Sequence, residues 1–96
     1  MKVTIGHITF DRVRYDDAGD VLYLHRADPS DAVDFDESPE GHHRRFDGDG
    51  RLIGVTIVRP QRLLETEGKV TITLRDRISV GADAVEPALT PTEPSE

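Results

Sequence analysis

The chain has 96 residues, of which 19 are acidic and 12 basic, so its formal net charge at pH 7 is −7. This length fits one domain, and the excess of carboxylates disfavours non-specific binding to nucleic acid or to an anionic membrane. There is no cysteine, which excludes disulfides and thiolate metal sites. No stretch has the apolar length of a signal-peptide core or a membrane span, so we expect a cytoplasmic protein.

The first third of the chain predicts a β-hairpin. Residues 8–15, "ITFDRVRY", are rich in β-branched and aromatic side chains, and their imperfect alternation indicates a bulge or bend near Asp11. The turn cluster "DDAGD" at 16–20 follows, and "VLYLHR" at 21–26 resumes a strand. Two strands joined by about five residues containing Gly are typical of a hairpin.

An acidic segment, residues 28–40, follows this hairpin. It contains two prolines and no Lys or Arg, and we expect a loop with a short extended piece at 33–35. Its six carboxylates are Asp28, Asp31, Asp34, Asp36, Glu37 and Glu40. They could form a docking surface for a basic partner, or they could belong to a solvated loop, as runs of charge commonly do.

The middle of the chain predicts a second hairpin. Residues 42–46 enter a strand, "DGDG" at 47–50 forms a turn, and "RLIGVTIVR" at 51–59 is a third strand. Strict alternation would place Ile53, Val55 and Ile57 on one face and Leu52, Thr56 and Val58 on the other. Apolar residues on both faces predict a central strand, and we expect a homodimer to bury the second face.

The "DGDG" stretch superficially resembles a calcium-binding loop. With Gly50 at the glycine position of an EF-hand, Asp47 and Asp49 take positions 3 and 5, but Arg45 takes position 1 and Thr56 takes position 12. Both ends of the ligand set are therefore missing. We interpret the stretch as a turn between strands.

The two turns belong to a weak internal repeat. "RYDDAGDVL" and "RFDGDGRLI" share an arginine, an aromatic residue, an aspartate, a glycine and two aliphatics, at an offset of 31 residues. In each, the aspartate is expected to accept backbone N–H groups and the glycine to supply a positive φ. The residues assigned to structural turns are Asp16, Gly19, Asp47, Asp49, Gly50 and Gly54.

The last third of the chain predicts a helix and further strands. Pro60 and Gly68 suit the start and end of a helix over 61–67, which should cover the sheet. A strand begins at Lys69, and another strand turn and a short helix from about Asp83 follow. We predict one α+β domain over 1–89, a twisted antiparallel meander of about five strands with one or two short helices on one face. Its core motif would span 10–64, its C-terminal strand and helix 69–89, and a disordered tail 90–96.

Few side chains are candidates for chemistry. His42 and His43 with Glu40 form the best metal candidate, but adjacent residues on a strand point to opposite faces, so two surface histidines are the alternative. We find no spacing typical of a nucleophile with its base and no phosphate-binding glycine loop. We therefore predict a protein that is not an enzyme and needs no cofactor.

Two motifs resemble the DUF2283 family of small bacterial proteins of unknown function. "YDDAGDVLYL" contributes Tyr15, Asp16, Asp20, Leu22, Tyr23 and Leu24, and "DGDGRLIGVTI" contributes Asp47, Asp49, Gly50, Arg51, Leu52, Gly54, Val55 and Ile57. Phe46 stands where tyrosine is common in the family. The resemblance covers about residues 10–64 and implies a β-rich, cytoplasmic bacterial domain. It brings no established activity, although some members look like companions of small toxin-like proteins.

The leading hypothesis is a non-catalytic protein-binding module, an antitoxin-like partner of a basic protein that is contacted through residues 28–40. One alternative is a metal-binding protein that uses His42, His43 and Glu40. The other is a purely structural homo-oligomer.

Overall fold

The computed structural model describes residues 2–74 and 77–89. Its strands are β1 (Val3–Ile5), β2 (Ile8–Phe10), β3 (Arg12–Asp16), β4 (Val21–His25), β5 (Asp34–Glu37), β6 (His43–Phe46), β7 (Leu52–Val58), β8 (Lys69–Thr73) and β9 (Arg77–Gly81). Its helices are α1 (Pro60–Glu67) and α2 (Ala82–Val85), with the short 3-10 turns η1 (Pro29–Asp31) and η2 (Glu86–Ala88). The α+β class is confirmed, and the tail predicted at 90–96 lies outside the described residues.

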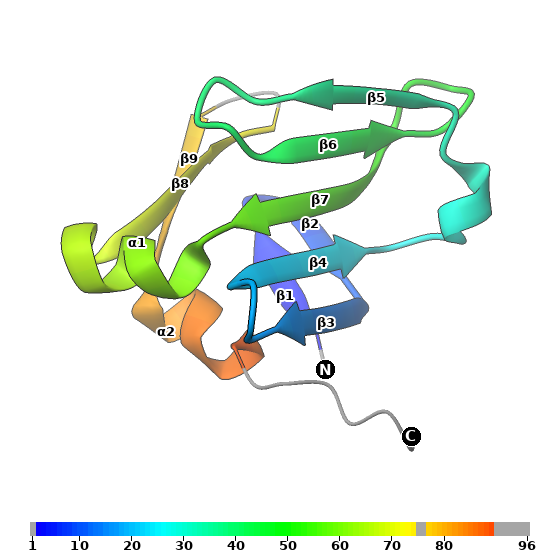
Figure 1. The fold of residues 1–96 in the computed structure, drawn as a ribbon. Helices are drawn as coiled ribbons and strands as arrows, with labels where there is room; N and C mark the ends of the chain where they lie inside the picture. The colour runs from blue at the N-terminus through cyan, green and yellow to red at the C-terminus, as the bar shows by residue number, and fades with distance from the viewer. Residues whose placement is uncertain (1, 75–76, 90–96) are drawn as a thin grey trace, which may run out of the picture.

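The central element is a five-stranded antiparallel sheet with the order β3-β4-β7-β6-β5 (Figure 1). Both predicted hairpins, β3–β4 and β6–β7, are present. Their second strands, β4 and β7, lie side by side at the centre, so the order is not that of the expected simple meander. The reason is burial, because β4 and β7 are the most apolar strands and gain most from having neighbours on both sides.

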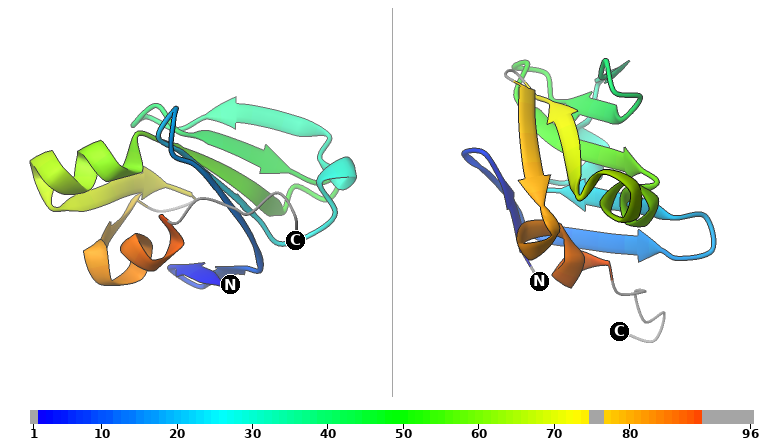
Figure 2. Two further views of the ribbon diagram at one scale, coloured as in Figure 1. Left: turned by 60° about the horizontal axis from the view of Figure 1, so that its bottom comes forward. Right: turned by 90° about the vertical axis from the view of Figure 1, so that its left-hand side faces the viewer.

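The remaining strands form two separate hairpins. The bend predicted near Asp11 is a complete break, because β2 pairs with β1 whereas β3 belongs to the large sheet. The strand predicted from Lys69 is β8, which pairs with β9 and not with the large sheet. Both hairpins lie on one side of the five-stranded sheet, behind it in Figure 1 and separated from it in the turned view of Figure 2.

The core fills the space between the sheet and these hairpins. Its fully buried side chains include Phe10 from β2, Leu22 and Leu24 from β4, and Val70 from β8. Helix α1 packs beside β8 and adds Leu63 and Leu64 to the rim of the core, while α2 adds Val85. The two hairpins, together with α2, therefore cover the face of the sheet on which one or two short helices were expected.

A bulge in β7 changes the side of the sheet on which Leu52 lies. Arg45 pairs with Gly54, but the next residue of β6, Phe46, pairs with Leu52, so Ile53 is the extra residue. Leu52 consequently joins the core and is only 6% exposed. The expectation that Leu52 lies on an open apolar face was wrong, because strict alternation does not hold across a bulge.

Candidate functional site

The acidic segment, residues 28–40, forms η1, β5 and the turn into β6 at one edge of the sheet (Figure 1). Its six carboxylates fall into two sets. Asp28, Asp36 and Glu40 accept hydrogen bonds from Ser30, Arg44 and Thr73, respectively. Asp31, Asp34 and Glu37 have no cationic partner among the described residues, although Asp34 accepts the N–H of its neighbour Phe35. The second set is therefore available to a partner molecule.

Asp36 is committed to Arg44. The guanidinium donates to both carboxylate oxygens, at 2.6 and 3.0 Å, in a bidentate pair. Its Nη1 also donates to the backbone carbonyls of Thr73 and Leu74, both at 2.9 Å. The arginine thus joins the edge strand β5 and its neighbour β6 to the end of β8, and Asp36 has a structural role.

Glu40 and His42 are also committed. The Glu40 carboxylate accepts the backbone N–H and the hydroxyl of Thr73, each at 2.8 Å. Desolvation opposes its ionisation, but these hydrogen bonds outweigh desolvation, so the pKa of Glu40 lies below its usual value. His42 is 2% exposed, its Nδ1 accepts the N–H of Val58 at 3.1 Å, and its ring also bonds to the backbone of Thr71. Burial is the main reason that the pKa of His42 is lowered.

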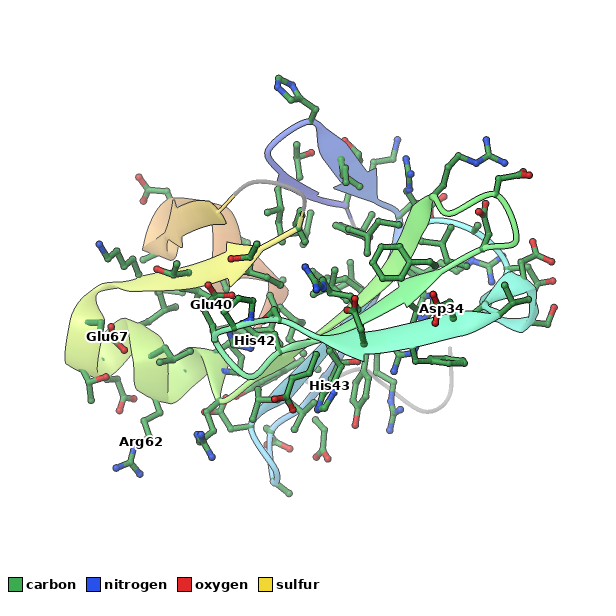
Figure 3. The ribbon with its side chains drawn as sticks, turned by 90° about the horizontal axis from the view of Figure 1, so that it is seen from above. Asp34, Glu40, His42, His43, Arg62 and Glu67 are labelled. Atoms are coloured by element: carbon green, nitrogen blue, oxygen red, sulfur yellow. The ribbon has the colours of Figure 1, made fainter. Side chains whose placement is uncertain are left out.

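The proposed metal ligands are not brought together. Figure 3 shows Glu40 and His42 on the side of the sheet that β8 covers, whereas His43 lies on the other side and is exposed. Within residues 2–74 and 77–89, no group of three or more His, Asp or Glu side chains is arranged to hold a metal ion. The side chains that a metal would need are engaged in backbone hydrogen bonds.

The two turns use different residues for similar geometry. In the second turn, Asp47 Oδ1 accepts the N–H groups of Asp49 and Arg51, both at 2.9 Å, and Gly50 has the positive φ of 79°. The hydrogen bond from the Arg51 amide is the main reason that the pKa of Asp47 is lowered. In the first turn the positive φ belongs to Asp20, at 52°, and not to Gly19 as the repeat suggested.

Two exposed apolar side chains lie within the acidic segment. Val33 is 65% exposed and Phe35 is 63% exposed, and they are the large hydrophobic residues most open to solvent in the described chain. Phe35 lies on β5 and Val33 immediately precedes that strand, so both exposed apolar side chains are close in sequence to the free carboxylates. Their signal in the sequence was two apolar residues within an acidic run, which the charges of that run obscured.

Comparisons with known proteins identify a family but no activity. None of the helices within the described ranges is long and apolar enough to span a membrane. Searches of the curated proteins and of the solved structures returned no match. A family model described as a protein of unknown function, DUF2283, matches residues 12–59, which is half of the chain and holds both motifs noted in the sequence. The chain therefore belongs to the DUF2283 family.

Proposed function

We propose that this chain is a non-catalytic protein-binding module of the bacterial cytoplasm whose contact surface is the acidic segment, residues 28–40. The observation that carries the proposal is the exposed pair Val33 and Phe35, close in sequence to Asp31, Asp34 and Glu37, which have no cationic partner among the described residues. Aromatic anchors commonly supply much of the binding energy of an interface, while surrounding charges select the partner and speed its approach. The partner should therefore present a hydrophobic pocket ringed by Lys or Arg.

The backbone of β5 is a weak site for the addition of a strand. β5 is an edge strand of four residues, all exposed, and the carboxylate of Asp34 accepts the N–H of Phe35 at 2.9 Å. The strand is also short and carries three carboxylates, which are recognised ways to protect a sheet edge. We expect the partner to bind through side chains and not by extending the sheet.

Charge also favours a different protein over a second copy at this surface. Two acidic segments facing each other would bring Asp31, Asp34 and Glu37 against their own equivalents, which is repulsive. A small basic protein, as in an antitoxin-like pairing, suits the surface better. Homodimerisation through another face stays a separate prediction, which sedimentation at high micromolar concentration would contradict by showing a monomer.

The proposal is tested by affinity capture from a lysate of the source organism, with the wild type and Phe35→Ser as baits. We expect the wild type to retain a basic protein at low salt and to lose it at high salt, because exposed charge pairs are screened. The Phe35→Ser bait should retain much less of the same protein, since it lacks the aromatic anchor. Equal retention by both baits would contradict the assignment of this surface.

A further inference from the structure

The face of the five-stranded sheet opposite the core has a distinct composition. In Figure 1 no other described strand or helix crosses in front of it. Strand register places its side chains in three rows. The first row is Arg12, His25, Gly54, Arg45 and Phe35, and the second is Arg14, Tyr23, Thr56, His43 and Glu37. The third row is Asp16, Val21 and Val58. We call these three rows the open face.

The open face is cationic although the whole chain is acidic. It holds three arginines against two carboxylates, Glu37 at the β5 edge and Asp16 at the end of β3. Other acidic residues of the chain lie in turns, as Asp17 and Asp49 do, or on α1, as Glu65 does. A net charge of −7 disfavours polyanion binding only if the charges are evenly spread, and here they are not.

Buried polar atoms on this face have no partner among the described residues. They are His25 Nδ1, Arg45 Nη1 and Thr56 Oγ1. His25 and Arg45 flank Gly54 on the neighbouring strands, and Thr56 lies two residues further along β7. Thr56 is only 6% exposed. The His25 ring also has a hydrogen bond to the backbone of Ile53. Buried polar groups are nearly always hydrogen-bonded to protein, to water or to a ligand, so these atoms leave donors and acceptors open to a polar ligand.

Planar groups lie beside these atoms. The Arg14 guanidinium stands 5.1 Å from the centre of the Tyr23 ring, on the two strands at the β3 side of the sheet. An arginine over an aromatic ring offers a flat cationic surface. Proteins that bind single-stranded nucleic acid combine such planar groups, on which bases stack, with cations that contact phosphates.

We infer that the open face binds single-stranded nucleic acid. Arg12, Arg14 and Arg45 contact phosphates, and a base stacks on the Arg14–Tyr23 pair. Nucleic acid fits better than an acidic peptide. The anionic groups of either ligand would bind the cations, but only nucleic acid has bases that stack on the ring and use the unpartnered donors and acceptors. Three phosphate contacts on a single strand predict a salt slope of about −2, which weakens binding about twenty-fold between 50 and 200 mM salt.

The test is fluorescence anisotropy of the full chain with labelled 12-mers of oligo-U and oligo-dT, at both salt concentrations. The double variant Arg12→Glu/Arg14→Glu should weaken binding by at least about ten-fold, because it removes two phosphate contacts. The control Arg62→Glu/Lys69→Glu makes the same change in charge at exposed sites on α1 and β8, and should change affinity by less than about two-fold. Tyr23→Leu should weaken binding at constant salt slope.

Three results would overturn the inference. They are no binding of the wild type at 50 mM salt, an equal loss in the control variant, or competition by poly-L-glutamate as effective as that by unlabelled oligonucleotide. The last result would assign the open face to an acidic protein. The dependence of affinity on salt concentration is measured on the wild type alone. It therefore still tests the inference if a substitution unfolds the chain.

Discussion

The hydroxyl of Tyr15 donates a hydrogen bond of 2.8 Å to Asp20 Oδ1, and the same carboxylate binds the start of α1. Its two oxygens accept the backbone N–H groups of Gln61 and Arg62, each at 3.1 Å. The residue at the N-cap position, Arg59, makes no side-chain cap, so Asp20, which lies 41 residues before Gln61 in sequence, performs that role. The tyrosine and aspartate of the first family motif thus join the first hairpin to the helix.

Replacing Asp20 with alanine should destabilise the fold. The change removes both helix-capping bonds and leaves the Tyr15 hydroxyl without this acceptor, so we expect the free energy of unfolding to fall by about 2 kcal/mol. Urea denaturation measures it. Asp17→Ala, at an exposed position of the same turn, should change stability by less than about 0.5 kcal/mol. Equal effects of the two substitutions would show that the cap contributes nothing.

Tyr15 should make stability decrease at high pH. Burial, followed by the hydrogen bond to Asp20, raises the pKa of Tyr15 from 10.0 to about 12. Between these values the unfolded chain releases the phenolic proton while the folded chain keeps it, so stability is complete below pH 10 and is lost as the pH rises toward 12. Unfolding measured across this range should show the decrease in the wild type and not in Tyr15→Phe. The same slope in both proteins would argue against the shift.

Gly54 should be intolerant of any side chain. A Cβ atom at this position would lie 2.7 Å from His25 Cε1 on the open face. Gly54→Ala should therefore lower the free energy of unfolding by about 1–3 kcal/mol, and adding His25→Ala should recover part of the loss. Gly48→Ala is the matched control, since nothing lies within 4 Å of its added Cβ. No recovery in the double variant would place the strain elsewhere.

The two shifted histidines should make the fold sensitive to mild acid. Burial lowers the pKa of His42, and burial together with the charges of Arg45 and Arg12 lowers that of His25. Below about pH 6.5 the unfolded chain takes up protons that the folded chain resists, so stability is lost as the pH falls. The slope should reach at most about 1.4 kcal/mol per pH unit for each residue. His42→Gln and His25→Gln should each reduce the slope, and a slope unchanged by both would contradict the shifts.

Much of the architecture could be predicted because the signals are local. The hairpins follow from period-2 patterns and turn chemistry, and α1 follows from Pro60 and Gly68, whose φ is +74°. Asp47 accepts the amides of its own turn, as its position two residues before Asp49 suggests. These features depend on residues within a few positions of one another.

The rest depends on contacts between distant residues. The pairing of β4 with β7, the bond from Arg44 to Thr73 and the cap of α1 by Asp20 join segments more than 25 residues apart. The bulge at Ile53 moved Leu52 to the core, which no periodicity could indicate. The same limit applies to the candidate site, where composition identified the carboxylates but not which of them are already hydrogen-bonded.

The most direct test of the proposed function is capture from the source lysate with two charge-matched baits, read by quantitative mass spectrometry. One carries Asp31→Asn, Asp34→Asn and Glu37→Gln, and the other carries Asp11→Asn, Asp17→Asn and Glu67→Gln at exposed sites outside the acidic segment. We predict that the first bait loses a basic protein which the wild type and the second bait retain, with a decrease in recovery of about ten-fold. Retention of the same proteins by all three baits would contradict a binding surface at residues 28–40.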